Sequence, residues 1–166
     1  MFREMRRKKQ QLSNSECLEI LDNSNTAVLA LVGDEGYPYT VPLNFVRIDN
    51  KVYFHCAKTG HKIDAVKNCD KASLCVVARD EVLPEKYTTK YESVVAFGRV
   101  SLVSDFAEMR AAIEKFALKY CPKESESNRE KAIEDEWNIL EMISFDIEHL
   151  TGKIGLEVLA ERNENK

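Results

Sequence analysis

The chain has 166 residues, of which 44% are hydrophobic and 31% are charged, so it can form one domain with a complete core and is too apolar to be disordered throughout. Its formal net charge of −4 gives no reason to expect a nucleic-acid partner. No run approaches the roughly 20 apolar residues that a transmembrane helix needs. We therefore expect a single domain over residues 1–166, with neither nucleic acid nor a membrane as partner.

The N-terminus carries five cations close together: Arg3, Arg6, Arg7, Lys8 and Lys9. Gln10 and Gln11 follow them, where a signal peptide would have an apolar core, so we expect a cytoplasmic protein. Residues 1–12 are interpreted as a basic tail that is either solvated or makes a local contact with an anion.

Cysteine usage argues against a cross-linked or metal-bound fold. The chain has five cysteines, an odd number, and no C-x-x-C pair occurs among them. The sequence therefore predicts reduced, mostly buried thiols, with neither a disulfide framework nor a metal site.

The first helix is predicted over residues 14–22. Ser13 and Glu16 have the S-x-x-E spacing of a capping box, in which each residue's side chain accepts a hydrogen bond from the other's backbone N–H. Polar residues 23–25 end this helix. The continuous apolar run 26–32 that follows has the length of a strand.

Residues 33–36 form a glycine-rich turn signal, so residues 26–32 and the next apolar run, 39–48, are predicted to pair as a hairpin. Pro38 and Pro42 cannot donate to a strand ladder. The second strand must therefore be an edge, a bulge, or a place where a ligand replaces a strand neighbour. The last possibility suits a ligand lying along residues 41–44.

A third strand is predicted over residues 51–57, joined to the second by a tight turn at Asp49-Asn50. It runs into Gly60, His61 and Lys62, where a helix pattern begins. Free backbone N–H groups at a helix start, together with a fixed cation, make a plausible phosphate site. The alternative from these residues alone is a plain hairpin followed by a surface helix.

Residues 72–78 are predicted to form a fully apolar strand, residues 79–90 a polar loop, and residues 91–103 a long strand with Gly98 at a bend or bulge. These strands are apolar on both faces. Each therefore needs cover on both sides, as in a barrel wall packed against helices or a second subunit.

Asp105 is a good N-cap for a helix over residues 106–120, whose apolar positions recur at a spacing of 3.6. Residues 122–128 are predicted to be a polar break, and residues 129–140 a second helix.

The C-terminal part is predicted to contain a strand over residues 142–150 and a turn at residues 151–153. Residues 154–159 are interpreted as a further strand or a terminal extension. Residues 160–166 are interpreted as a frayed tail.

Common catalytic signatures are absent from the sequence: it has no G-x-G-x-x-G, no P-loop and no G-x-S-x-G elbow. His55 and Cys56 are adjacent on a predicted strand, so their side chains point to opposite faces and cannot easily share one site. On the plainer interpretation His55 is a hydrogen-bonded interior residue and Cys56 is a small hydrophobe.

Four short motifs, followed by a fifth near the C-terminus, occur in a characteristic order: 37–45 (YPYTVPLNF), 53–57 (YFHCA), 60–62 (GHK), 91–98 (YESVVAFG) and 145–153 (FDIEHLTGK). In this order they resemble the pyridoxamine 5′-phosphate oxidase-like flavin-binding split barrels, and most closely the branch with nitroimidazole-resistance proteins. The resemblance spans nearly the whole chain. It implies a mainly β fold, a six-stranded antiparallel split barrel with flanking helices, which forms a homodimer with the cofactor at the subunit interface.

The resemblance also implies a site. The cofactor is expected to be FMN, with FAD as the alternative, and His55 the catalytic candidate. Residues 41–44 would lie along the flavin ring, and His61 and Lys62 would bind the phosphate. The cofactor-binding candidates are Val41, Pro42, Leu43, Asn44, His55, Cys56, Ala57, His61 and Lys62, with Val94 and Val95 closing the cleft. The family often has Ser or Gly at the position of Cys56.

The function implied is an FMN-dependent oxidoreductase that reduces small nitroaromatic compounds such as 5-nitroimidazoles. The C-terminal arginine-rich substrate motif of the substrate oxidases is missing here, which argues against oxidation of pyridoxamine phosphate itself. The alternatives are a flavin-binding, storage or stress protein without turnover, and a split barrel that binds haem or a deazaflavin.

Overall fold

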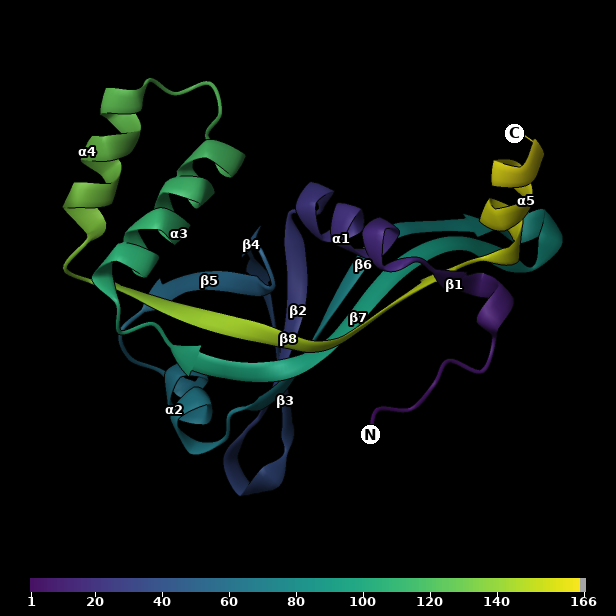
Figure 1. Ribbon diagram of the computed structural model, residues 1–166, viewed down its shortest axis with the longest axis horizontal. Helices are drawn as coiled ribbons and strands as arrows, with labels where there is room; N and C mark the ends of the chain where they lie inside the picture. Colours follow the sequence, from purple (N-terminus) through teal and green to yellow (C-terminus); the bar gives the residue numbers. More distant parts are fainter. Residues whose placement is uncertain (165–166) are drawn as a thin grey trace.

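The computed structural model describes residues 1–164, within which eight strands form one antiparallel sheet in the order β3-β2-β6-β7-β8-β5-β4, with β1 paired to β8 (Figure 1). The strands are β1 (Gln11–Leu12), β2 (Thr26–Val32), β3 (Pro38–Asn44), β4 (Val46–Ile48), β5 (Lys51–Ala57), β6 (Lys71–Leu83), β7 (Thr88–Leu102) and β8 (Leu140–Ile154). The helices are α1 (Asn14–Asn23), α2 (His61–Asn68), α3 (Phe106–Tyr120), α4 (Glu126–Glu136) and α5 (Leu156–Glu164). None of these helices has the length and apolar character needed to cross a membrane.

The sheet is curled, and it confirms the predicted split barrel. Six of its strands are at least seven residues long, namely β2, β3, β5, β6, β7 and β8, whereas β1 and β4 are short additions. One face holds the main core, to which α1 contributes Leu21 and α2 contributes Ile63. A second core lies between α3 and the other face of β5 and β8, around Tyr53, Phe116 and Met142. Figure 1 shows the α3–α4 hairpin at one end of the molecule and α5 at the other.

Elements with strong local signals form where the sequence predicts them. Helix α1 begins with a complete capping box between Ser13 and Glu16. At the start of α3, the carboxylate of Asp105 accepts a hydrogen bond of 2.8 Å from the N–H of Ala107. Strands β2 and β5 also have the predicted bounds.

The predicted strand 39–48 is divided in two by Phe45, which is completely buried. β3 pairs only with β2, so it is an edge strand of the sheet. That position accommodates Pro38 and Pro42, because neither needs to donate a hydrogen bond on the open side. Of the three possibilities left by the two prolines, the fold realises the edge.

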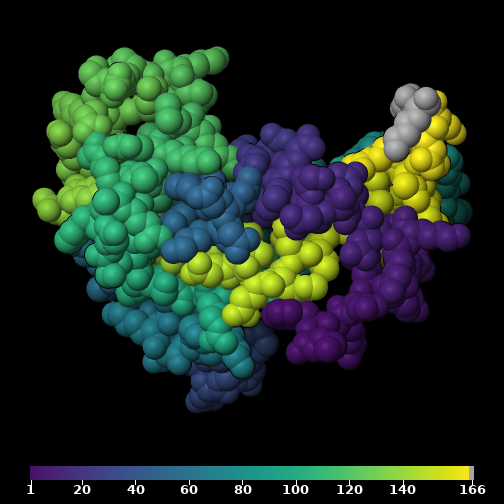
Figure 2. All heavy atoms as spheres, viewed as in Figure 1, coloured from purple at the N-terminus to yellow at the C-terminus, as the bar shows by residue number. Residues whose placement is uncertain are grey.

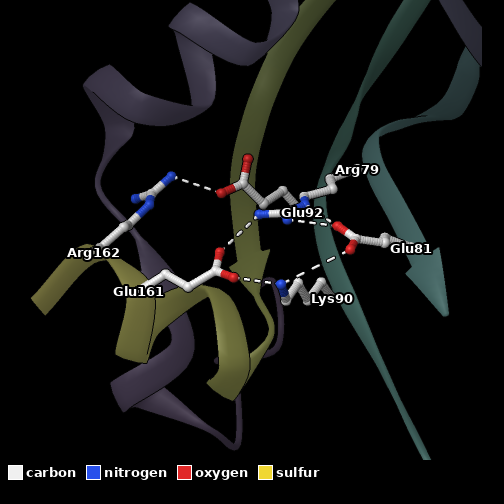
Figure 3. A network of polar contacts seen from close by, with 6 residues as sticks. All are labelled: Arg79, Glu81, Lys90, Glu92, Glu161 and Arg162. Atoms are coloured by element: carbon white, nitrogen blue, oxygen red, sulfur yellow. Dashed lines mark hydrogen bonds and ion pairs between the residues drawn. The ribbon is translucent and has the colours of Figure 1, made fainter. Parts of the chain in front are cut away.

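The predicted loop 79–90 is wrong, because β6 and β7 continue through it as a long hairpin. Three of its polar side chains, Arg79, Glu81 and Lys90, are paired with one another and with α5, as Figure 3 shows. Arg79 Nη2 lies 2.6 Å from Glu81 Oε2, and Lys90 forms an ion pair with Glu161 of α5. A polar stretch that looked solvated on its own is therefore a ladder held by charge pairs.

The C-terminal predictions need two corrections. Residues 151–153 continue β8 and do not turn the chain. Of the two interpretations of residues 154–159, the terminal extension holds and the further strand does not, because α5 begins at Leu156. The predicted frayed tail is helical to Glu164, since Glu161 and Arg162 dock α5 on neighbouring elements (Figure 3). Arg162 bonds Glu92 of β7 at 2.8 Å and Glu16 of α1 at 2.6 Å. Residues 165 and 166 lie outside the described part.

The starts of α4 and β8 also differ from the predicted ones. Helix α4 starts at Glu126, inside the predicted break, because the Ser125 hydroxyl caps it, and β8 already begins at Leu140. The predicted tail 1–12 is also partly structured, because Gln11 and Leu12 pair with Lys153 and Gly152 of β8.

Gly98 provides the first test of this fold. The β7–β8 register shifts between Phe97 and Gly98, which confirms the predicted irregularity. A Cβ atom at Gly98 would lie 1.9 Å from the carbonyl oxygen of Asp146. We expect Gly98→Ala to cost about 1–3 kcal/mol or more, since overpacking displaces backbone, and to lower the melting temperature by several degrees. Ser73→Ala on the neighbouring strand is the control, and equal melting temperatures for the two variants would contradict the close approach.

Candidate functional site

A hollow of about 610 Å³ lies between the end of the sheet and the α3–α4 hairpin. Its floor is formed by Asn44 of β3, His55 of β5 and Leu140 of β8. The two helices supply the wall, with the residues Ile113, Phe116, Ala117, Tyr120, Arg129, Ala132 and Ile133 among its lining. This volume is within the range of small-molecule and cofactor sites.

The wall is fixed to the floor through Phe45. The Tyr120 hydroxyl lies 3.0 Å from the N–H of Phe45, which donates to it, and 2.8 Å from the carbonyl oxygen of Phe45, which accepts from it. Lys119 donates to the carbonyl of Ser24 at 2.6 Å, and its ammonium lies 4.5 Å from the centroid of the Phe45 ring. The C-terminal end of α3 is therefore attached to the end of β3.

His55 lies on the α3 side of β5. Its ring packs edge-to-face on Phe116, with centroids 4.7 Å apart and an interplanar angle of 85°. The His55 side chain is exposed at the hollow, but its partial desolvation lowers its pKa, and the nearby ammonium of Lys62 lowers it further. The imidazole is therefore neutral at neutral pH, with one nitrogen able to donate a hydrogen bond and the other able to accept one.

Cys56 lies on the opposite face of β5 and packs against the main core. Burial raises the pKa of its thiol, although the Lys62 charge acts in the other direction. The two neighbours are thus separated, as strand geometry requires, and the thiol of Cys56 does not share the hollow with His55. Ala57 follows on the His55 side, is exposed, and pairs with Leu140.

The two predicted phosphate ligands, His61 and Lys62, have different surroundings. Lys62 is close enough to the end of β5 for its charge to shift the pKa values of both His55 and Cys56. His61 instead stacks on Tyr39 with ring centroids 4.1 Å apart, and its Nε2 lies 3.6 Å from a carboxylate oxygen of Asp34. Only Lys62 is thereby brought toward His55.

Side chains alternate along β3. Val41 and Leu43 pack against the main core, whereas Pro42 and Asn44 are exposed. Asn44 lines the hollow and donates a hydrogen bond of 3.0 Å to the carbonyl of Asn25. Because β3 has no strand on its outer side within residues 1–164, its outward backbone groups are free to bind a ligand there, whereas the side chains of Val41 and Leu43 are not.

Val94 and Val95 point to opposite sides of β7. Val94 is completely buried in the main core, so its side chain does not reach the surface of this chain. Val95 is half-buried and belongs to the other face, paired with Cys75 and Thr151.

No signal in the sequence indicates that the helical hairpin lines the site. Phe116 and Tyr120 belong to the apolar stripe of α3, and such a stripe ordinarily indicates core packing. Phe116 does both, since it packs in the second core and also lines the hollow. Arg129 and Ile133 come from α4, whose sequence shows no marked apolar face.

A family model described as pyridoxamine 5′-phosphate oxidase matches residues 13–154. No curated protein matches the sequence.

Many solved structures share the fold. A candidate 5-nitroimidazole antibiotic resistance protein from Bacteroides thetaiotaomicron has a TM-score of 0.72 and 19% identity, covering 87% of this chain and 86% of that one. The flavocytochrome Anf3 from Azotobacter vinelandii has a TM-score of 0.72 and 20% identity, with coverages of 92% and 72%. A FAD-binding protein from Mesorhizobium loti has a TM-score of 0.63 and 20% identity, with coverages of 88% and 97%. At these identities the likeness concerns the fold alone.

The environment of His55 predicts its titration. We expect its pKa, measured by NMR of the imidazole, to lie below 6.5, the ordinary value. Lys62→Gln should raise that pKa only part of the way, because burial is the larger cause. A full return to the ordinary value in Lys62→Gln would show that charge, and not burial, dominates.

The free energy of unfolding should depend on pH through the same titration of His55. The folded protein holds His55 neutral, whereas the unfolded chain protonates it below about pH 6.5, so its contribution to stability is lost as the pH falls through that value. Denaturant unfolding between about pH 7.5 and pH 5 should therefore show a smaller loss for His55→Gln than for the wild type. An equal loss of unfolding free energy in the wild type and in His55→Gln over this pH range would contradict a lowered pKa of His55.

Proposed function

The chain belongs to the pyridoxamine 5′-phosphate oxidase family, and from this we propose that it binds a flavin, FMN in the first place, and acts as an oxidoreductase on small nitroaromatic compounds such as 5-nitroimidazoles. The observation that carries the proposal is the hollow beside His55 and Asn44, with an open strand edge next to it and the Lys62 cation close by. The names of fold neighbours, among them a candidate 5-nitroimidazole antibiotic resistance protein and a FAD-binding protein, support the same class.

These residues fit a flavin. An aromatic ring system needs apolar walls, which Phe116 and Ile133 offer in the hollow. The ring's polar edge needs hydrogen-bond partners, which the open backbone edge of β3 and the neutral His55 can provide. The phosphate needs a cation beside free N–H groups, which Lys62 at the start of α2 supplies.

The role of each part of the site follows from this fit. A bound flavin would supply the electron-transfer chemistry. The open edge of β3 orients its ring, and the helical hairpin excludes water from one side of it. His55 holds a proton on one ring nitrogen and can donate it in a hydrogen bond to a ligand in the hollow, while Lys62 neutralises part of the phosphate charge.

The absorbance spectrum of the purified protein tests the proposal. A flavin spectrum that NAD(P)H bleaches, and that a nitro compound restores, is the expected result. A flavin spectrum without turnover would favour a binding or storage role. A haem spectrum would replace the flavin proposal, since a flavocytochrome shares the fold.

We also propose that the active form is a homodimer, because the outer face of the sheet carries exposed apolar side chains on neighbouring strands: Val28, Val32, Val77 and Phe97. Exposed apolar side chains gathered on one face of a sheet are typical of an interaction site. Val95 lies on this same face, which is consistent with a cleft completed by a second subunit.

Val77 tests the homodimer. Its side chain is 61% exposed within one chain, so Val77→Glu should leave an isolated subunit folded and shift the light-scattering mass toward the monomer. Val82→Glu is the matched control, since Val82 is 66% exposed but lies on the hairpin arm, and it should remain dimeric. A wild-type monomer that contains bound flavin would contradict this proposal.

Lys62 tests the phosphate site. A charge-assisted contact is worth roughly 1.5–3 kcal/mol, so Lys62→Ala should weaken FMN binding about tenfold to a hundredfold. Riboflavin lacks the phosphate and should bind wild type and variant about equally. Lys67→Ala, near the other end of α2, is the control.

Titration of both flavins into the apoprotein separates the outcomes. An equal loss for FMN and riboflavin would mean that Lys62 shapes the hollow generally. Unchanged FMN affinity would place the phosphate elsewhere. His61 is half-exposed beside Asp34, so the double change of His61 and Lys62 to Ala should lose little more than Lys62→Ala.

A further inference from the structure

The hollow beside His55 contains one arginine to which the flavin fit gives no role. Arg129 of α4 lines this hollow and is half-buried. We propose that its guanidinium binds the carboxylate of an aromatic acid, so that the substrates of this site are small nitroaromatic compounds with a carboxylate, of the nitrobenzoate type. This inference rests on the proposed function, because it names the substrate class of the same site.

Arg129 belongs to the helical wall of the hollow. The side of α4 that lines the hollow consists of Arg129, Ala132, Ile133 and Glu136, which recur at helical spacing. Figures 1 and 2 show the α3–α4 hairpin as a lobe at one end of the molecule, with α4 at its outer edge. The exposed apolar face proposed for the homodimer lies on β2, β6 and β7, so α4 is not part of that face.

The guanidinium of Arg129 has donors left for a ligand. It donates a hydrogen bond to the carbonyl oxygen of Glu124, which also lines the hollow. Within residues 1–164 no carboxylate forms an ion pair with Arg129, whereas Arg110, the other arginine of the hairpin, contacts the carboxylates of Glu114 and Glu130. A guanidinium has five N–H donors in a planar fork. Most of those of Arg129 therefore lack an acceptor in the described part of the chain.

Two carboxylates, those of Glu124 and Glu136, also line the hollow. Both side chains are exposed, whereas Arg129 is half-buried, so water screens the negative charges more strongly. Glu124 already accepts a hydrogen bond of 3.1 Å from the Asn128 amide. Glu136 lies two helical turns from Arg129, which is about 10 Å along the axis and about one Debye length at 0.1 M salt. A charged group beside Arg129 is therefore attracted if it is an anion.

The rest of the lining favours an aromatic ring on that anion. Ile113, Phe116 and Ile133 give the hollow apolar walls, against which a planar ring can pack. A carboxylate matches the guanidinium fork with both of its oxygens. A nitro group also has two oxygens in a plane but carries no net charge, so it binds this fork more weakly. Arg129 thus selects the carboxylate and leaves the nitro group for the flavin.

Calorimetric titration of benzoate and benzamide into the purified protein tests this inference without turnover. The two probes share one ring and differ in charge. We expect the wild type to bind benzoate at least about tenfold more tightly than benzamide, and Arg129→Gln to remove that difference. Arg110→Gln is the matched control, since Arg110 does not line the hollow, and it should keep the preference within about twofold. Circular dichroism and melting temperatures check the fold of both variants.

Three results would overturn the inference. The first is equal affinity of the wild type for benzoate and benzamide. The second is tighter binding of benzylamine than of either probe, because Glu124 and Glu136 would then select a cation. The third is a loss of FMN affinity in Arg129→Gln as large as its loss of benzoate affinity, which would assign Arg129 to the cofactor.

Failure of this inference can be distinguished from failure of the proposed function. A protein without a flavin spectrum that keeps an Arg129-dependent preference for benzoate would refute the flavin proposal and leave the aromatic-acid site standing. A reduced flavin that nitrobenzoate and nitrobenzamide reoxidise equally well, at equal concentrations below saturation, would support the proposed function and refute the selection by Arg129.

Discussion

The contact between Phe45 and the end of α3 is the constraint on which the candidate site depends. Phe45 lies between the edge strand β3 and β4, and both of its backbone polar groups bond the hydroxyl of Tyr120. A buried N–H or carbonyl without a partner is costly, so this hydroxyl stabilises the break between β3 and β4. The same contact attaches the α3–α4 hairpin to the sheet and thereby creates the wall of the hollow.

The local electrostatics of that hollow follow from the geometry of a single strand. Alternation along β5 places His55 toward α3 and Cys56 toward the main core. Partial desolvation lowers the pKa of the His55 imidazole and raises that of the Cys56 thiol, so both groups are uncharged at neutral pH. The Lys62 ammonium lowers the pKa values of both groups. It lies at the start of α2, where backbone N–H groups have no partner within the helix. A cation beside a neutral, hydrogen-bonding ring is well suited to a ligand with an aromatic part and an anionic part.

Charge pairs organise the other end of the molecule. Arg79, Lys90 and Glu161 connect the β6–β7 arm with α5, and Arg162 connects α5 with β7 and α1 (Figure 3). Single exposed pairs contribute little, but networks with shared partners contribute more. Here the network and the buried side chain of Val158 together hold the C-terminal helix in place. The basic N-terminal segment differs, because Arg6 and Arg7 have no carboxylate partner in the described chain.

The sequence by itself determined the elements whose signals are local: the capping box of α1, the apolar strands β2 and β5, and the N-capped α3. Pro38 and Pro42 left an edge, a bulge or a ligand site open for β3, and the sheet order decided for the edge. The sequence also indicated His55 and Asn44, which the fold brings to one hollow. Only the tertiary structure decided that residues 79–90 form a ladder, that Val94 faces the core and that α4 lines the site. These outcomes depend on partners far apart in the chain, such as Arg79 with Glu161, 82 residues away, and Phe45 with Tyr120, 75 residues away. Local propensity carries no information about such pairings, because their energy appears only when the curled sheet brings the partners together.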